Sequence, residues 1–248
     1  METFREVDVV VHDRLVSKEI LDMIPESVRR INVGKASHGF GPSQEEINWI
    51  LLCEAMDGNN VLRLKGGDPM LFSRGGEEIE VLQGGEIEYE IVPGVSSATG
   101  IPSYVGIPLT HRKISSSVAF VTGHEDLDKL ETSVDFVSIA SSVDSLVILM
   151  GVEMVRHIAE KLVMGGVDPA TPIAVIENGT MSNQKVNFSS LERILEGDLR
   201  GKINPPALII VGDVVHLSRD FSSVELSDGA LQEELMESKT WCAAAEYS

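Results

Sequence analysis

The stretch Val61-Leu62-Arg63-Leu64-Lys65-Gly66-Gly67-Asp68-Pro69 decides how the rest of this chain is interpreted. A short β-rich run over 61–65 ends in two glycines, an aspartate and a proline, and an amphipathic segment follows over 71–82. This pattern predicts a strand, a tight turn and a helix. The glycines allow the backbone of the turn to come close to a bound molecule, and open α/β sheets bind ligands at such carboxyl ends of strands. The turn is therefore a candidate wall of a cofactor site.

Strand and helix patterns alternate through the rest of the first half. Apolar, β-rich runs predict strands over 7–11, 30–33 and 87–92. Ser17 predicts the start of a short helix, and Ser43 with Glu46 forms a capping box that begins a longer one. A second turn, Pro93-Gly94-Val95-Ser96-Ser97-Ala98, again leads from a strand into a helix. Such alternation is typical of a mostly parallel sheet.

The second half resumes these signals after a polar, basic linker over 110–117. We expect strands over 118–122, 146–150, 173–176 and 207–211, and helices over 154–163 and 191–195. The fold class is therefore α/β, with one α/β domain over 1–113 and a second over 114–224. A small-molecule site is expected in the cleft between the two domains. Residues 225–248 lose any periodic pattern and predict a weakly ordered acidic tail.

The chain is strongly acidic, with a net charge of −19 over 248 residues. This charge argues against nucleic acid or an anionic membrane as a partner. No apolar run is long enough for a transmembrane helix, and the first residues lack the apolar core of a signal peptide. The two cysteines, Cys53 and Cys242, exclude a disulfide framework and fit a reducing cytoplasm.

Cations are distributed unevenly along the chain. Residues 1–113 hold 11 Lys and Arg against 18 Asp and Glu, whereas the remainder holds 9 against 21. Those next to predicted turns of the first half are Arg14, Lys35, Lys65, Arg74, His111, Arg112 and Lys113. Any one of them alone is compatible with a solvated surface. As a group they suggest that an anionic ligand meets the first half.

Spacing alone leaves the chemistry of the turns open. Asp68 could accept hydrogen bonds from a ligand. Spacing alone favours an ordinary tight turn, in which the Asp68 side chain accepts a hydrogen bond from the backbone of the turn. Asp13, after the first strand, is equally compatible with a general base and with an acid at a helix N-terminus. Lys35 could hold carboxylates or move a proton, although a lone lysine is usually solvated. The glycine patterns of phosphate loops and dinucleotide-binding turns are absent, and no metal site is predicted.

Several motifs together resemble the uroporphyrinogen-III C-methyltransferases, a family within the tetrapyrrole methylases. The longest is the run 61–78, and shorter ones lie over 8–17, 33–35, 92–97 and 106–112. The resemblance covers roughly residues 5–220 in order and is weakest over 125–145. It implies a protein of two α/β domains that forms dimers and binds S-adenosylmethionine in the cleft between its domains. It also implies two successive methyl transfers to uroporphyrinogen III, giving precorrin-2 for siroheme, cobalamin or related cofactors.

The resemblance assigns roles by motif position. It implies that the cofactor is contacted by Gly66, Gly67, Asp68, Leu71, Ser96, Ser97, Met150, Gly179 and Ala207. It assigns Asp13 as proton acceptor and Lys35 as proton donor. The carboxylates of the substrate explain the cations of the first half, and we expect Arg14, Lys35, His111 and Arg112 to hold them.

The chain departs from the family at its start. The family begins with a strand and a Gly-x-Gly-Pro-Gly-Asp turn, and no counterpart of this stretch is present in the sequence given. Without that strand, we expect the sheet edge at 7–11 to be unpaired. Two alternatives therefore stand beside the main hypothesis: a sister methylase that acts on another corrin intermediate, and a truncated, inactive fragment that dimerises or binds ligand.

Overall fold

The structure is a computed structural model that describes residues 4, 6–34, 41–123, 134–199 and 203–218. The chain divides into two compact units, Met1–Gly100 and Ile101–Ser248, which are described separately below. The sequence placed the domain boundary after residue 113, so the observed division falls earlier in the chain. Within the described residues, no helix is long and apolar enough to cross a membrane. The predicted tail lies outside the described residues.

Unit 1 contains a small parallel sheet with β1 (Val9–His12) at its centre. β2 (Arg29–Asn32) pairs with one side of β1 and β3 (Val61–Leu64) with the other, both in parallel register. Because β1 is paired on both sides and covered on both faces, its three valines are almost completely buried. The expectation of an unpaired edge at 7–11 is therefore wrong. Among the described strands, β2 and β3 are the edges of this sheet, because each pairs with β1 alone.

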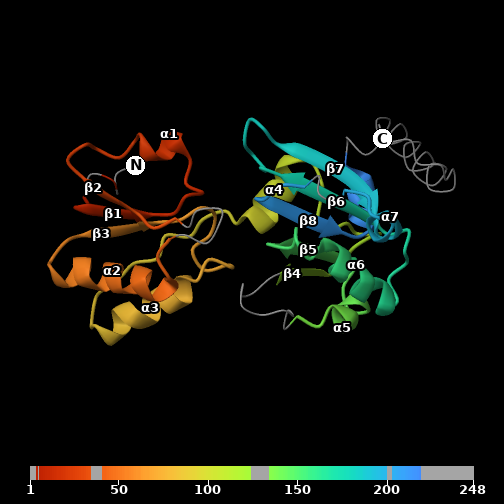
Figure 1. Cartoon of the computed structure of the whole chain (residues 1–248), viewed down its shortest axis with the longest axis horizontal. Helices are drawn as coiled ribbons and strands as arrows, with labels where there is room; N and C mark the ends of the chain where they lie inside the picture. Colours follow the sequence, from red (N-terminus) through yellow and green to blue (C-terminus); the bar gives the residue numbers. More distant parts are fainter. Residues whose placement is uncertain (1–3, 5, 35–40, 124–133, 200–202, 219–248) are drawn as a thin grey trace, which may run out of the picture. The chain divides into compact units, whose positions relative to one another are not determined.

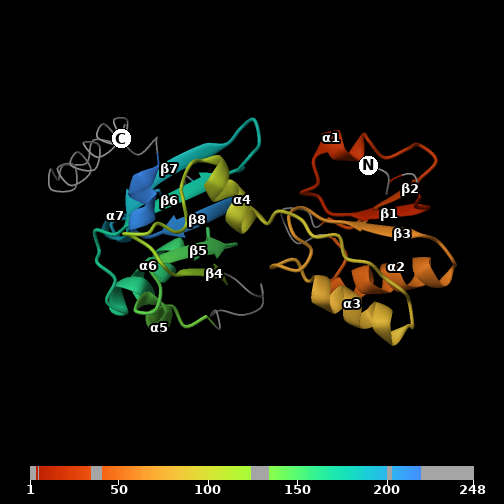
Figure 2. The same ribbon diagram turned by 180° about the vertical axis from the view of Figure 1, so that it is seen from behind.

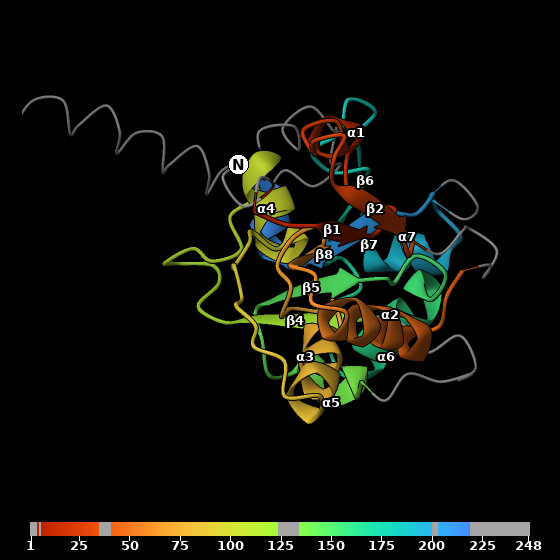
Figure 3. The same ribbon diagram turned by 90° about the vertical axis from the view of Figure 1, so that its left-hand side faces the viewer.

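Helices cover the two faces of this sheet, as Figure 1 and Figure 3 show. α2 (Gln44–Met56) buries Ile47 and Leu51 against Val9 and Val11, and α3 (Gly75–Gly84) packs beside it. α1 (Lys18–Leu21) lies on the other face, where Val10 packs. The predicted caps are present. Ser17 accepts from the Ile20 backbone, and Ser43 forms a complete capping box with Glu46.

The predicted strand over 87–92 does not form. No described residue shares a backbone hydrogen bond with 88–92, and Val92 is 65% exposed. A strand requires a neighbouring strand to satisfy its backbone groups, and the described part of unit 1 offers none at this position. The prediction of a strand over 87–92 is therefore wrong, because pairing depends on a partner that a local pattern does not contain.

The helix predicted over 71–82 begins later than expected. Asp68 accepts from the Met70 backbone, and the Ser73 hydroxyl donates to the carbonyl of Pro69. Arg74, at the N-cap, has a left-handed backbone with φ of 59°. These local contacts hold 68–74 as a compact loop, so α3 starts at Gly75.

Unit 2 contains a five-stranded sheet of order β4-β5-β8-β6-β7. The strands are β4 (Val118–Thr122), β5 (Ser145–Leu149), β6 (Pro172–Glu177), β7 (Lys185–Ser190) and β8 (Ala207–Val211). Only β4 and β5 pair in parallel among these strands, and the other pairings are antiparallel. The mostly parallel sheet predicted from the first half is therefore confirmed in unit 1, whereas the sheet of unit 2 is mostly antiparallel. β7 was not predicted, and its short connection to β6 is of the kind that joins antiparallel neighbours.

The helices of unit 2 enclose a large apolar core. α5 (Phe136–Ala140) and α6 (Val155–Met164) lie on one side of the sheet, as Figure 2 shows. α7 (Leu191–Leu195) adds Leu191 and Ile194 to the same core, and η2 (Asp213–Leu217) follows β8. α4 (Ser97–Tyr104) spans the division between the two units. The expected α/β character is thus present in both units.

Candidate functional site

The strands of unit 1 end together because they are parallel. Asp13 and Arg14 follow β1, Gly34 follows β2, and Gly66 follows Leu64 and Lys65 at the end of β3. A Cβ atom on Gly34 would lie 2.4 Å from the Arg14 backbone nitrogen, so these two loops are in close contact. Sequence reasoning predicted ligand contacts from separate stretches, and the structure gathers those of unit 1 at one end of the sheet. We call this region the carboxyl end of unit 1.

Asp68 joins the two predicted turns at this end. One carboxylate oxygen accepts from the Met70 nitrogen at 2.8 Å, and the other accepts from the Gly94 nitrogen at 3.1 Å. The first contact is the local turn bond that spacing favoured. The second ties the turn at 66–69 to the turn at 93–96. The side chain therefore has a structural role here, and contact with a cofactor stays a prediction.

Two glycines allow these turns to approach each other. Gly67 has φ of 80°, a conformation that side chains rarely adopt. A Cβ atom on Gly94 would lie 2.2 Å from the carbonyl oxygen of Gly67. Gly66 and Gly67 are both exposed, so the surface between the turns consists of backbone. A ligand can come close to such a surface, because no side chain stands in its way.

The remaining predicted residues of unit 1 differ in exposure. Ser96 is buried, and its hydroxyl accepts from the Ala98 nitrogen at 3.2 Å, which supports the start of α4. Ser97 is exposed and Leu71 is half-buried. Lys35 lies outside the described residues. Asp13 and Arg14 lie on one loop, and the Gly66-Gly67 turn contacts that loop through Leu15, 3.7 Å from a Cβ on Gly66.

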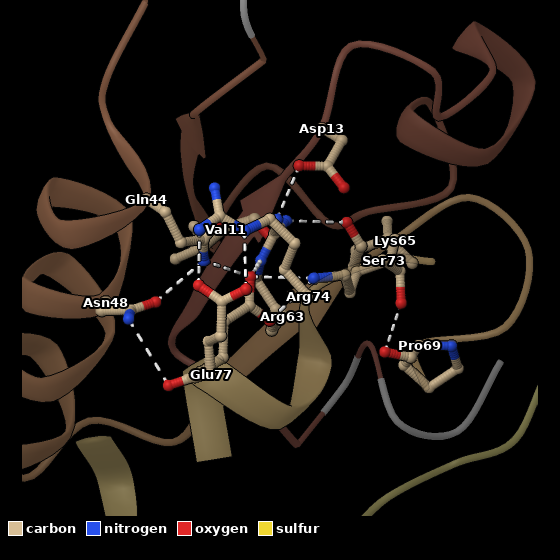
Figure 4. A network of polar contacts seen from close by, with 12 residues as sticks. Val11, Asp13, Gln44, Asn48, Arg63, Lys65, Pro69, Ser73, Arg74 and Glu77 are labelled. Atoms are coloured by element: carbon tan, nitrogen blue, oxygen red, sulfur yellow. Dashed lines mark hydrogen bonds and ion pairs between the residues drawn. The ribbon is translucent and has the colours of Figure 1, made fainter. Parts of the chain in front are cut away.

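An ionic cluster lies directly beneath the carboxyl end of unit 1 (Figure 4). The Arg63 guanidinium donates to Asp13 Oδ1 at 2.6 Å and to Glu78 Oε1 at 3.0 Å. The Lys65 ammonium donates to both oxygens of Glu78 at 2.8 Å. Gln44 adds a weaker contact to the same carboxylate at 3.4 Å. The cluster links β3, α2 and α3 to the loop that carries Asp13.

Burial within the cluster is graded. The side chains of Glu78 and Lys65 are 6% and 7% exposed, that of Arg63 is 14% exposed and that of Asp13 is 30% exposed. The neighbouring pair of Arg74 and Glu77 is different, because both side chains are about half exposed. The hydrogen bond from Arg74 is the main cause that lowers the pKa of the Glu77 carboxyl. Of the two adjacent glutamates of α3, Glu77 thus belongs to a surface ion pair and Glu78 to the buried cluster.

Sequence reasoning missed this cluster. Arg63 and Lys65 were noted only within a motif or as cations near a turn, and Glu78 was assigned no role. The available signal was the alternation of β3, because charged residues two apart on a strand point to the same face. That face carries Val61, which packs in the core beside Val9 and α2. A charged pair on a core-facing side requires buried partners, but the sequence does not say which acid supplies them.

Unit 2 brings three predicted cofactor residues together at one end of its sheet. Met150 follows β5, Gly179 follows β6, and Ala207 begins β8, which runs antiparallel to both. Glu177 and Ala207 are directly paired across the strands, and so are Leu149 and Leu208. Met150 has φ of 54° and the residue is 54% exposed. We call this region the Met150 end of unit 2.

Glu177 fixes the loops at the Met150 end. It is 3% exposed, accepts from the Asn187 side chain at 3.0 Å, and accepts from the Asn204 backbone nitrogen at 3.0 Å. The Asn178 nitrogen donates to the Pro206 carbonyl at 2.9 Å. The segments that carry Gly179 and Ala207 are therefore held side by side. Sequence reasoning assigned no role to this buried glutamate.

His111 and Arg112 lie away from the Met150 end. They form a tight turn closed by paired backbone bonds between His111 and Ser115. The Ser115 hydroxyl is 2.8 Å from that of Ser145, the first residue of β5. Since Met150 follows the last residue of β5, the turn lies at the opposite end of the unit 2 sheet. The structure therefore does not bring these two residues together with Met150, Gly179 and Ala207.

Comparisons with known proteins identify the family. The family model Tetrapyrrole (Corrin/Porphyrin) Methylases matches residues 1–195. An S-adenosyl-L-methionine-dependent uroporphyrinogen III methyltransferase of Methanosarcina barkeri is 49% identical over 210 residues, which cover 85% of this chain and 82% of that protein. Siroheme synthase 2 of Yersinia enterocolitica is 40% identical over 95% of this chain but only 49% of its own length, so the chain spans about half of it.

A solved structure gives the same result. Uroporphyrin-III C-methyltransferase from Thermus thermophilus, complexed with S-adenosyl homocysteine, matches with a TM-score of 0.75 at 37% identity. The match covers 87% of this chain and 90% of that one. The resemblance inferred from the motifs and the predicted α/β fold class are thereby confirmed. The chain belongs to the tetrapyrrole methylases.

Proposed function

We propose that this chain transfers methyl groups from S-adenosylmethionine to two ring carbons of uroporphyrinogen III and so forms precorrin-2. The observation that carries the proposal is the 49% identity, over 85% of the chain, to a uroporphyrinogen III methyltransferase. The product would feed siroheme or cobalamin synthesis, and siroheme synthases are among the relatives.

The residues present fit the cofactor. In unit 1, Gly66 and Gly67 present exposed backbone beside the turn at 93–96, which is a surface that an extended small molecule can approach. In unit 2, Met150, Gly179 and Ala207 share one end of the sheet. These residues, with Asp68, Leu71, Ser96 and Ser97, would hold S-adenosylmethionine. When bound, this cofactor supplies a methyl group that its sulfonium already activates.

The chain mainly has to align the substrate and manage one proton. Asp13 is the candidate for the proton that the ring system loses after a carbon–carbon bond forms, because its carboxylate is partly exposed at the carboxyl end of unit 1. Arg14, exposed on the same loop, is the candidate for holding substrate carboxylates. Lys35 stays the predicted proton donor and a predicted carboxylate ligand. The assignment of His111 and Arg112 to the substrate also stays a prediction.

We further propose that the protein works as a homodimer in the cytoplasm. Apolar side chains gather over 89–95, where Tyr89 and Ile91 are 42% and 41% exposed and Val95 is 75% exposed. Exposed apolar surface, where it is contiguous, marks interaction sites, so this segment is the candidate for the dimer contact. Light scattering of the purified protein tests the dimer, and a monomer at micromolar concentration would contradict it.

Methyl transfer tests the function directly. The purified protein is incubated anaerobically with uroporphyrinogen III and methyl-labelled S-adenosylmethionine. We expect label in the tetrapyrrole and, after oxidation, a red-shifted chromophore. Later corrin intermediates are offered in parallel, because labelling of one of them alone would indicate a sister methylase. Binding of S-adenosylhomocysteine without any transfer would indicate an inactive, ligand-binding protein.

A further inference from the structure

Arg63 of β3 and Lys65, the residue directly after β3, face the interior of unit 1. Side chains alternate along a strand, so Val61, Arg63 and Lys65 share one face, whereas Leu62 and Leu64 pack on the other face with Val10. The first face is the one that α2 covers. Arg63 and Lys65 are therefore placed against an apolar layer, and their side chains are only 14% and 7% exposed.

One carboxylate contacts both of these cations. Glu78 of α3 is 5% exposed and lies 3.0 Å from Arg63 Nε and 2.8 Å from Lys65 Nζ. Arg63 also donates to the carbonyl oxygen of Val11 at 3.3 Å, on the adjacent strand. The guanidinium is thus held from two directions, by a buried acid and by the backbone of β1.

Stability alone gives no good reason for such a cluster. Removing charges from water is costly, and well-packed apolar residues often replace a buried ion pair with no loss of stability. The cluster is not closed, however. The far side of the Arg63 guanidinium reaches Asp13, which is 30% exposed and lies at the carboxyl end of unit 1. Within the part of the chain that the structure describes, Arg63 is the partner of the Asp13 side chain.

We propose that Glu78 is a positioning residue: it holds Arg63 in place, so that Arg63 fixes the Asp13 carboxylate at the carboxyl end of unit 1. The inference rests on the proposed function, in which Asp13 accepts the proton. Only Oδ1 of Asp13 contacts Arg63. This contact also fixes the orientation of Oδ2, to which no described residue donates a hydrogen bond. A proton acceptor requires such an oriented oxygen that can still take up a proton.

Lys65 completes the charge balance of the cluster. The cluster holds two carboxylates, of Asp13 and Glu78, and two cations, so its charges balance. Glu78 forms an ion pair with Lys65 as well as with Arg63. The fork of the guanidinium can reach two carboxylates at once, whereas an ammonium is a point charge. Arg63 therefore links Glu78 to Asp13, so that a shift of Glu78 would move the Asp13 carboxylate. Among the described residues, Lys65 forms an ion pair with Glu78 alone and balances its charge.

The test compares two adjacent glutamates of α3. Glu78→Gln removes the buried charge, and Glu77→Gln removes the exposed pair with Arg74 and serves as the matched control. We expect Glu78→Gln to lower kcat for methyl transfer on the order of 10²-fold, as misplacement of a reacting group does, with the affinity for S-adenosylhomocysteine unchanged. Glu77→Gln should leave kcat within about twofold, as exposed pairs contribute little.

A double-mutant cycle separates positioning from general damage. If Glu78 acts through Asp13, then Glu78→Gln should cause no further loss in a protein that already carries Asp13→Asn. Additive losses, or a Glu78→Gln variant as active as Glu77→Gln, would overturn the proposal. Glu78→Asp, which keeps the charge, should recover part of the lost kcat. If Glu78→Gln does not fold, the pair Lys65→Met and Glu78→Gln keeps the cluster balanced and takes its place in the cycle.

A readout without turnover distinguishes this inference from the proposed function. The Arg63 side-chain NεH proton should be protected from solvent exchange in the NMR spectrum of the wild-type protein and of Glu77→Gln. It should lose this protection in Glu78→Gln. An unprotected proton in the wild type would overturn the inference, whatever the activity. A wild-type protein with a protected proton but no methyl transfer would refute the proposed function alone.

Discussion

The carboxyl end of unit 1 and the Met150 end of unit 2 are held together by different interactions. In unit 1, charged side chains contact each other, and the most exposed member of the cluster is Asp13. In unit 2, the buried Glu177 contacts amide groups and backbone, with no cation among its described partners. The first arrangement places a charged side chain, whereas the second places backbone loops. The difference suggests that unit 1 contributes reactive groups and unit 2 contributes a binding surface.

The largest expected effect comes from the charged side chain itself. Asp13→Asn keeps the shape of the residue but removes the carboxylate, so kcat should fall by about 10²- to 10⁴-fold, the usual contribution of a general base. The affinity for S-adenosylhomocysteine, measured by calorimetry, should not change. A variant with normal kcat would show that the carboxyl end of unit 1 does not supply the proton acceptor.

The next effect probes the backbone of unit 1. Gly94→Ala places a Cβ atom 2.2 Å from the Gly67 carbonyl, so the turns at 66–69 and 93–96 must separate. We expect the Kd for S-adenosylhomocysteine to rise about 10- to 100-fold, in line with a strain of about 1–3 kcal/mol. Gly76→Ala is the control, since nothing lies within 4 Å of its added Cβ. Equal affinity in both variants would place the cofactor away from these turns.

A smaller effect is expected from the loops of unit 2. Glu177→Ala leaves the Asn187 amide and the Asn204 backbone without their acceptor, at a cost of about 1–3 kcal/mol in the free energy of unfolding. The Kd for S-adenosylhomocysteine should rise about tenfold because Gly179 and Ala207 lose their fixed spacing, while kcat at saturating cofactor should hold. Glu192→Gln, at an exposed position of α7, is the control. A loss confined to kcat would contradict the division of roles between the two ends.

The smallest effect concerns the cations. Arg14→Ala removes a charge from the loop that carries Asp13, and we expect the KM for uroporphyrinogen III to rise about tenfold, as the loss of one charge-assisted hydrogen bond implies. Arg112→Ala acts at the opposite end of the unit 2 sheet from Met150, so its KM should change less. If Arg112→Ala had the larger effect, the substrate would contact the turn at 111–115, as the distribution of cations predicted.

Local patterns in the sequence were sufficient for most elements and for the outline of the site. The three strands of unit 1, the caps at Ser17 and Ser43, and the turns at Gly66-Gly67 and Pro93-Gly94 all depend on neighbouring residues, so they could be predicted. Parallel pairing then placed the strand ends together. The motifs also identified the family correctly, because each is a run of neighbouring residues that is present before the chain folds.

What the tertiary structure decided depends on residues far apart in the sequence. Among the described residues, the segment 87–92 found no partner strand. β8 inserted antiparallel between β5 and β6, and the turn at 111–115 came to lie away from Met150. The two acidic partners of Arg63 are 50 and 15 residues away along the chain. By itself the sequence determined which residues are charged, apolar or flexible and which local elements they form. Only the fold decided that Glu78 and Asp13 meet on one guanidinium, because burial and pairing are properties of the packed chain.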